Sequence, residues 1–157
     1  MTPEREYPDQ PLVGVGGVVI DNGRALLIRR GSPPLEGQWS IPGGLLELGE
    51  TLAQGVAREL AEETGLEVHV LELIEAFERI DPALPRADGT PGDSVRPQYH
   101  FVILDYLCEV RGGTLRAGSD ALEFAWARED QLAKFDLTVL ATRALRKAFA
   151  VVRARAT

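Results

Sequence analysis

The segment 43–66 constrains the fold more than any other part of the chain, because it predicts one helix whose two ends are both marked. Thr51 followed three residues later by Gln54 is the pattern of a capping box, which begins a helix at the next residue. Gly65, with an aliphatic residue after it, is typical of a left-handed helix stop. We therefore predict a helix from Leu52 to Thr64.

This helix is expected to have a packing face and a polar face, because successive side chains turn by about 100° around the axis. The packing arc holds Val56, Leu60, Ala53, Thr64, Ala57 and Ala61, and the polar arc holds Arg58, Glu59, Glu62 and Glu63. Leu52 departs from this division because it lies on the polar arc. Gly55 lowers helix stability by roughly 1 kcal/mol relative to alanine, which indicates a close approach of another part of the backbone.

Three carboxylates of the polar arc define the chemistry that the helix suits. Glu59, Glu62 and Glu63 are spaced i, i+3 and i+4, so they share one helix face within about one turn. Like charges at this spacing repel, and only Arg58 is close to them in sequence. The pattern predicts a divalent cation with oxygen ligands, Mg²⁺ or Mn²⁺. A solvated acidic face balanced by distant lysines is the alternative.

The same segment resembles the Nudix box, GX5EX7REUXEEXGU with U aliphatic, at every defined position from Gly44 to Leu66. The preceding residues, from Gly37 through Trp39 to Gly44, are similar to the GXWXXPGG approach common in that family. The resemblance implies a mixed α/β fold, an α/β/α sandwich in which a curled sheet lies between the box helix and a C-terminal helix. The length of 157 residues suits one domain, and we expect a single domain over residues 1–157.

The resemblance also implies roles for individual residues. The metal ligands are expected to be the carboxylates of Glu59, Glu62 and Glu63 and the backbone carbonyl of Gly43. The metal is expected to be Mg²⁺, with Mn²⁺ possible. The candidates for catalysis are Glu62, Glu59, Arg58, Asp120 and Glu123. One carboxylate among Glu62, Asp120 and Glu123 would accept a proton from the attacking water, while surface acidity is the alternative for the last two.

Three further residues are candidates for the substrate side of the site. Arg29 and Arg30 end a predicted strand, and alternation places only one of them on the site face. A guanidinium there would grip a substrate phosphate, and a solvated strand end is the alternative. Glu50 is grouped with them, and by resemblance it pairs with Arg58 and holds the box loop.

The expected reaction is metal-dependent attack of water on a phosphoric anhydride. The resemblance favours a nucleoside diphosphate linked to another group, and ADP-ribose in particular, because Pro82 stands sixteen residues beyond the box. Nucleoside triphosphates, including oxidised ones, and diadenosine polyphosphates are the alternative substrates. A nucleotide-sensing module without catalysis is the alternative of another class.

The rest of the chain predicts strands at 12–20, 25–28, 67–78, 98–110 and 124–127 and a helix at 137–153. We expect an irregular arm at 1–10 and a flexible loop at 80–97, either a flap beside the substrate or a surface insertion. No regular βαβ repeat is present, which favours a mixed sheet.

The charge and hydropathy of the chain limit its partners. A net charge of −7 argues against duplex nucleic acid, which binds proteins through lysine and arginine. The apolar runs are too short to span a membrane, so we expect a cytoplasmic protein with a small nucleotide substrate. A homodimer is possible, because dimers are common in the family that the chain resembles.

Overall fold

The computed structural model describes residues 5–92, 96–116 and 121–156 of the chain. Its elements, in chain order, are β1 (Leu12–Asp21), β2 (Arg24–Arg30), β3 (Trp39–Ser40), β4 (Gly43–Leu45), α1 (Leu52–Thr64), β5 (Leu66–Asp81), β6 (Tyr99–Gly113), β7 (Ala121–Ala127), the 3₁₀ helix η1 (Glu129–Lys134) and α2 (Val139–Arg155). The predicted alternation of strands with two helices is confirmed.

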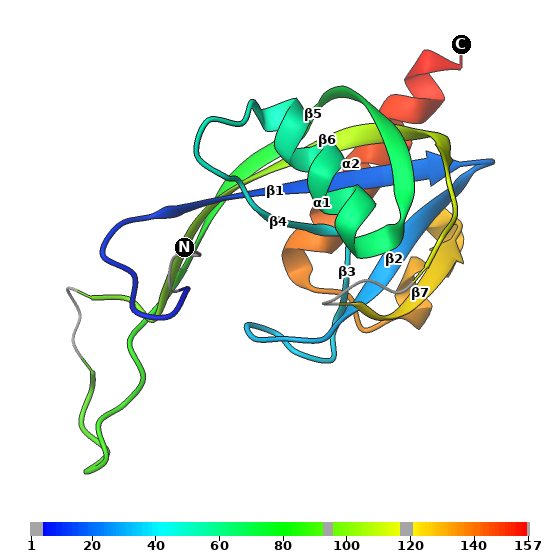
Figure 1. Ribbon diagram of the computed structural model, residues 1–157. Helices are drawn as coiled ribbons and strands as arrows, with labels where there is room; N and C mark the ends of the chain where they lie inside the picture. The colour runs from blue at the N-terminus through cyan, green and yellow to red at the C-terminus, as the bar shows by residue number, and fades with distance from the viewer. Residues whose placement is uncertain (1–4, 93–95, 117–120, 157) are drawn as a thin grey trace.

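The strands form one mixed sheet in the order β3-β2-β1-β6-β5, with β4 added to β1 and β7 added to β2 (Figure 1). Strand β1 runs parallel to β6, whereas the other paired strands are antiparallel. Strands β1 and β2 are joined by Asn22 and Gly23, both with positive φ, as a tight hairpin turn requires. The mixed sheet agrees with the expected class.

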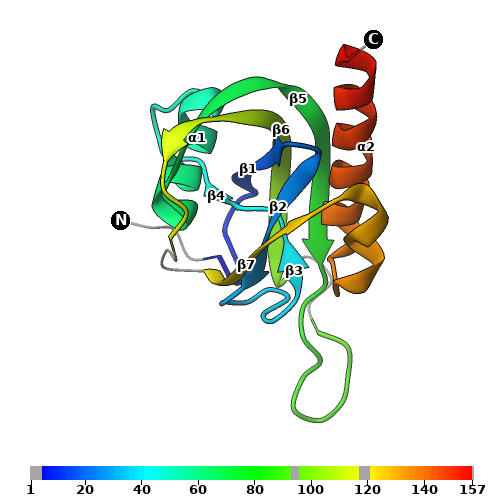
Figure 2. The ribbon, with the colours of Figure 1, turned by 90° about the vertical axis from the view of Figure 1, so that its right-hand side faces the viewer.

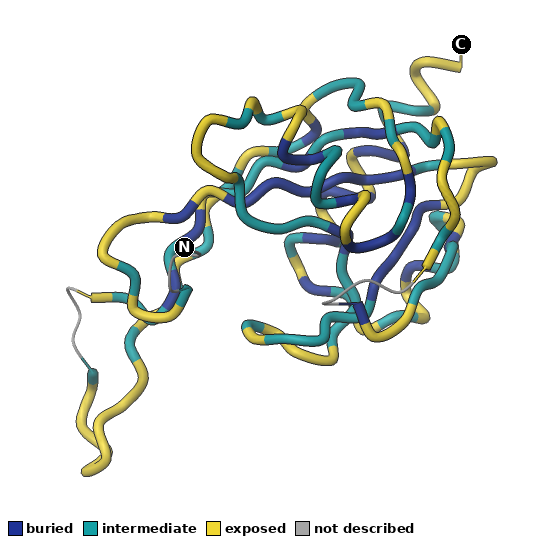
Figure 3. Tube along the Cα trace, viewed as in Figure 1, coloured by how far each residue is buried: buried dark blue, intermediate teal, exposed yellow. Residues whose placement is uncertain are grey.

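The two long helices cover opposite faces of this sheet (Figure 2). Side chains alternate along β1, so that Val15 and Val19 pack with α1 while Val18 packs with α2. The buried segments in Figure 3 follow the sheet between the helices. Neither described helix has the combination of length and apolar character that a membrane crossing requires.

Helix α1 has the predicted bounds and both predicted caps. The Thr51 hydroxyl accepts from the backbone N–H of Gln54 at 3.1 Å, the Gln54 side chain accepts from the backbone N–H of Thr51 at 2.9 Å, and Gly65 has φ 79°. These contacts satisfy backbone groups that a helix end otherwise leaves unpaired.

The division of α1 into faces was wrong in part. Ala53 and Ala61 are exposed, whereas Glu63 is 6% exposed. The reason is Gly55: a side chain there would lie 2.6 Å from Leu46, so the helix packs closely at this point. The buried face of α1 is therefore shifted from the predicted arc toward positions 52, 55, 59 and 63. This shift also explains why Leu52 packs against the core.

The hairpin formed by β5 and β6 projects from the body of the fold, and its connection lies at 82–98 (Figure 1). The predicted loop began too early, because Ile80 and Asp81 still pair with β6. The described part of the N-terminal arm runs beside this connection. The backbone N–H of Tyr7 donates to the carbonyl of Gln98 at 2.7 Å.

We expect the α2 contact to supply a large part of the stability. Leu145 is fully buried against the sheet, and replacing it with alanine leaves a cavity, so Leu145→Ala should lower the free energy of unfolding by about 2–5 kcal/mol. The neighbouring exposed Arg146 gives the control, since Arg146→Ala should change it by less than about 0.5 kcal/mol. Urea denaturation of both variants measures the difference, and equal midpoints would contradict this packing.

Candidate active site

Arg58 organises the loop that precedes α1. Its guanidinium binds Glu50 in a bidentate pair, with Nε at 2.6 Å from Oε2 and Nη2 at 2.9 Å from Oε1. Nη2 also donates to the carbonyl of Leu45 at 3.0 Å, so the arginine ties the loop to β4. Two parallel charge-assisted bonds fix geometry as well as charge. The expected pairing of Glu50 with Arg58 is present in the structure.

The same guanidinium also contacts two carboxylates of the helix itself. Arg58 Nη1 donates to Glu59 at 2.9 Å and to Glu62 at 3.2 Å. One arginine therefore offsets the repulsion that the i, i+3 spacing creates. The two carboxylates differ in exposure, because the Glu62 side chain is 58% exposed and that of Glu59 only 17%.

These contacts shift the titration of the cluster. The hydrogen bond from Arg58 and the backbone N–H of Glu47 lower the pKa of Glu50 from the ordinary 4.5 to about 2. The bond with Glu50 raises the pKa of Arg58 still further, so the guanidinium stays charged. Burial raises the pKa of Glu59, and the Arg58 charge offsets part of that effect.

Glu59 and Glu63 line a small cavity of about 40 Å³ together with Gly43 and Gly44. The backbone N–H of Gly43 donates to Glu63 Oε2 at 2.9 Å, which holds the buried carboxylate against the start of β4. The Glu59 carboxylate lies against the α-carbon of Gly44, where any side chain would collide with it. The helix and β4 thus bring two of the predicted carboxylates and the predicted backbone ligand to one place.

This donor set suits a hard cation. Mg²⁺ typically takes one or two protein carboxylates and completes its shell with waters and substrate phosphates. Two carboxylates beside a backbone carbonyl meet that requirement, and the cavity has room for an ion and a water. Within the described residues, no three acidic, histidine or cysteine side chains converge as a closed metal site.

Not all predicted site residues meet in this cavity. The carboxylate of Glu62 is turned toward Arg58 and lines neither cavity of the site. Glu123 lies on β7, where its carboxylate is 3.6 Å from Nε of Arg29 and largely exposed. Asp120 lies outside the described residues.

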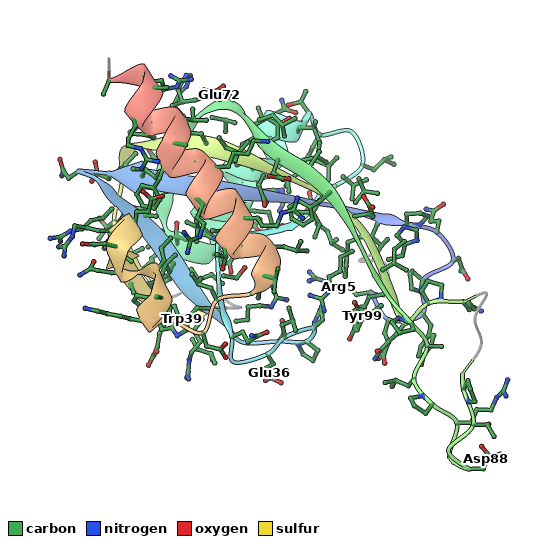
Figure 4. The ribbon with its side chains drawn as sticks, turned by 180° about the vertical axis from the view of Figure 1, so that it is seen from behind. Arg5, Glu36, Trp39, Glu72, Asp88 and Tyr99 are labelled. Atoms are coloured by element: carbon green, nitrogen blue, oxygen red, sulfur yellow. The ribbon has the colours of Figure 1, made fainter. Side chains whose placement is uncertain are left out.

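A second, larger cavity of about 400 Å³ opens beside the small one. It lies between the sheet and the beginning of α2, and Arg5, Arg30, Gly43 and Gly44 line both cavities. In the view onto the α2 side, Arg5 lies between the loop that carries Glu36 and the strand start at Tyr99 (Figure 4). Strands β5 and β6 contribute the apolar side chains of Phe77, Phe101 and Ile103 to its walls, together with the charged residues Arg79 and Asp105.

Of the two predicted arginines, the structure places Arg30 at the cavities. Its Nε donates to the carbonyl of Pro34 at 2.7 Å, which fixes the stem of the side chain against the 31–38 loop. Arg29 points to the other side of β2, toward Glu123. Trp39 packs edge-on against Phe135, with ring centroids 5.0 Å apart, and lines neither cavity.

Sequence reasoning missed Asp105, which lines the large cavity and is 3% exposed. Burial, with a smaller contribution from the charge of Glu75, raises its pKa to about 7. The signal was an aspartate inside the otherwise apolar stretch from Phe101 to Cys108. Aspartate is almost never fully buried unless it is paired, and a buried carboxyl with a raised pKa that lines a cleft is a candidate functional residue.

The fold and the box geometry define a member of the Nudix hydrolase family. The sequence profile described as the NUDIX domain matches residues 10–148, so the chain belongs to this family. The expected resemblance is confirmed.

Two relatives and one solved structure illustrate the likeness. The chain is 35% identical over 113 residues to an ADP-ribose pyrophosphatase of Methanocaldococcus jannaschii, covering 72% of this chain and 59% of the relative. It is 36% identical over 148 residues to a MutT-like protein of Streptomyces ambofaciens, covering 92% of this chain and 83% of that protein. The crystal structure of a MutT NUDIX hydrolase from Burkholderia pseudomallei superposes with a TM-score of 0.72 at 30% identity, covering 88% of this chain and 98% of that one.

The bidentate ion pair between Glu50 and Arg58 should make the free energy of unfolding sensitive to acid. The folded-state pKa of Glu50 is depressed to about 2. The contribution of the ion pair to the free energy of unfolding is therefore complete above pH 4.5 and is lost as the pH falls toward 2. Glu50→Gln should therefore lower the urea midpoint at neutral pH and match the wild type near pH 2. Urea denaturation across this range measures the gap. A gap of constant size would contradict the pairing.

Proposed function

We propose that the protein is a metal-dependent pyrophosphohydrolase. Its substrate would be a nucleoside diphosphate joined to a second group, with ADP-ribose-type compounds favoured. The observation that carries this proposal is the continuity of the two cavities. A pocket with the carboxylates of Glu59 and Glu63 shares Arg30, Gly43 and Gly44 with a cavity large enough for a nucleoside.

The protein's own groups divide the work of such a reaction. Glu59, Glu63 and the Gly43 carbonyl would hold Mg²⁺ or Mn²⁺, which when bound polarises phosphoryl oxygens and lowers the pKa of a bound water. Arg30, which lines both cavities, would hold a substrate phosphate there by its forked donors. Arg58 would position Glu59 through the bond at 2.9 Å rather than touch substrate.

The proton acceptor is expected among the carboxylates near the pocket. Glu62 is adjacent to it on the helix, and its contact with Arg58 at 3.2 Å is largely exposed to solvent. A side chain in that position can rotate toward the pocket without breaking a buried interaction. Glu123 and Asp120 stay as the other candidates, and separate glutamine or asparagine variants would rank the three by loss of turnover.

The relatives support the substrate class without deciding it. One relative is named an ADP-ribose pyrophosphatase, and others at 26–27% identity are named nucleoside triphosphatases. A nucleoside triphosphate therefore stays as the second candidate substrate. We further propose a cytoplasmic location and a homodimeric assembly.

The first test is hydrolysis of a panel of ADP-ribose, diadenosine polyphosphates and nucleoside triphosphates with Mg²⁺. Coupling to a phosphatase and measuring phosphate release should reveal turnover of ADP-ribose. Glu63→Gln should reduce it by about 10²–10⁴-fold, because it removes a charged ligand from the pocket. Glu78→Gln, on the exposed face of β5, is the matched control and should leave turnover unchanged.

Preference for a triphosphate in this assay would select the second candidate substrate. Nucleotide binding without turnover in either Mg²⁺ or Mn²⁺ would instead support a sensing module and contradict the proposed enzyme.

Metal binding can be tested apart from catalysis. Mg²⁺ at about 100 times its Kd should stabilise the folded state by about 2.7 kcal/mol and raise the melting temperature. Glu59→Gln and Glu63→Gln should abolish this rise, whereas Glu78→Gln should retain it. An equal loss in Glu62→Gln would mean that Glu62 leaves Arg58 when metal binds. No rise in the wild type with Mg²⁺ or Mn²⁺ would contradict the metal site.

A further inference from the structure

Asp105 occupies a special place in the large cavity. It lies on the face of β6 that is turned toward α2, beside Gly16 of β1. A side chain at Gly16 would lie 2.5 Å from Oδ1 of Asp105, so the glycine makes the room that the carboxyl group fills. The residue is 3% exposed and lines the cavity wall.

The described residues leave this carboxyl without a hydrogen-bond partner at the cavity wall. Among the described residues, none donates a hydrogen bond or forms an ion pair with Asp105, although nearly all buried polar groups in proteins have a partner. Its partner across the strands is Glu75, another carboxylate, which is itself paired with Arg143 at 2.9 Å and Lys147 at 3.7 Å on α2. Burial and the like charge of Glu75 both favour the protonated form of this carboxyl.

The surroundings of Asp105 suit a flat aromatic ligand. Phe77, Phe101 and Ile103 line the same cavity, so an aromatic ring can pack on apolar surface while its edge reaches the carboxyl. The cavity mouth carries two exposed apolar side chains, Leu35 and Val139, which would cover the ring from outside.

The register of the strands sets the distance between Gly43 and Asp105. Gly43, Gly16 and Asp105 are neighbours across β4, β1 and β6. Two strand spacings amount to about 10 Å. That separation is of the order of the length of a nucleoside monophosphate. A phosphate beside Gly43 can therefore belong to the same nucleotide as a base beside Asp105.

We propose that Asp105 is a specificity residue that reads the base of the substrate. Its carboxyl would accept a hydrogen bond from an exocyclic amino group and donate one to the adjacent ring nitrogen, as adenine presents them. Guanine presents two adjacent N–H donors instead, which a protonated carboxyl cannot satisfy in the same way. This inference rests on the proposed function, because it assumes that the cavity holds the nucleoside of that substrate.

The test measures binding of three monophosphates by titration calorimetry, so it needs no turnover. Wild type should bind AMP about 10- to 100-fold more tightly than purine riboside monophosphate, which lacks the amino group, and more tightly than GMP. Asp105→Asn should keep this order, because an amide also offers one acceptor and one donor. Asp105→Leu should lose it, and Asp21→Asn, exposed at the end of β1, should match the wild type.

Each other result decides against the assignment. A folded Asp105→Leu that keeps the AMP preference, a wild type that binds GMP best, or a wild type that fails to prefer AMP would overturn it. A loss of the AMP preference in Asp105→Asn would contradict the claim that the carboxyl of Asp105 binds the base in its protonated form. If wild type prefers AMP through Asp105 yet hydrolyses none of the panel, the proposed enzyme fails while this site stands.

Discussion

The guanidinium of Arg58 is the interaction on which the site depends. It joins the loop through Glu50, the end of β4 through the carbonyl of Leu45, and the helix through Glu59 and Glu62. Without that cation, several carboxylates would crowd one helix face with no charge to oppose them. Exposed ion pairs contribute little to stability, but a half-buried bidentate pair in a network fixes geometry. This network of Arg58 thus holds Glu59 at the small cavity before any ligand binds.

The sheet divides the work between its two faces. Helix α1 supplies carboxylates, and the space beneath the start of α2 supplies an apolar cavity, and the two meet at Gly43 and Gly44. The meeting point needs glycine because Gly43 lies against the backbone of Val15 and Gly16, and Gly44 lies against Glu59. A side chain at Gly43 would push β4 away from β1, and a side chain at Gly44 would displace the carboxylate of Glu59. The glycines of β1 and β4 therefore allow close contact between neighbouring strands and with helix α1.

The helix, its caps and the main strands could be predicted from sequence because each has a local cause. Capping residues, a left-handed glycine and regular alternation act within a few residues. The short strands β3 and β4 and the helix η1 were missed, since two to six residues are too few to show a period. The exposure of Ala53 could not be predicted either. The face that α1 buries is set by the close contact between Gly55 and Leu46, and Leu46 lies outside the helix.

The site shows the same limit. The spacing in the sequence selected Glu59, Glu62 and Glu63 alike. Only the packed structure shows that Glu59 and Glu63 line the small cavity, whereas Glu62 is largely exposed and pairs with Arg58. Asp105 belongs to no motif. Its place in the cavity depends on strands far apart in sequence, and none of the described residues pairs with its carboxyl. Burying such a group unpaired costs stability, by about 1–3 kcal/mol for a neutral polar group. A packed apolar side chain would avoid that cost, whereas the structure keeps at this point a carboxyl that faces the cavity.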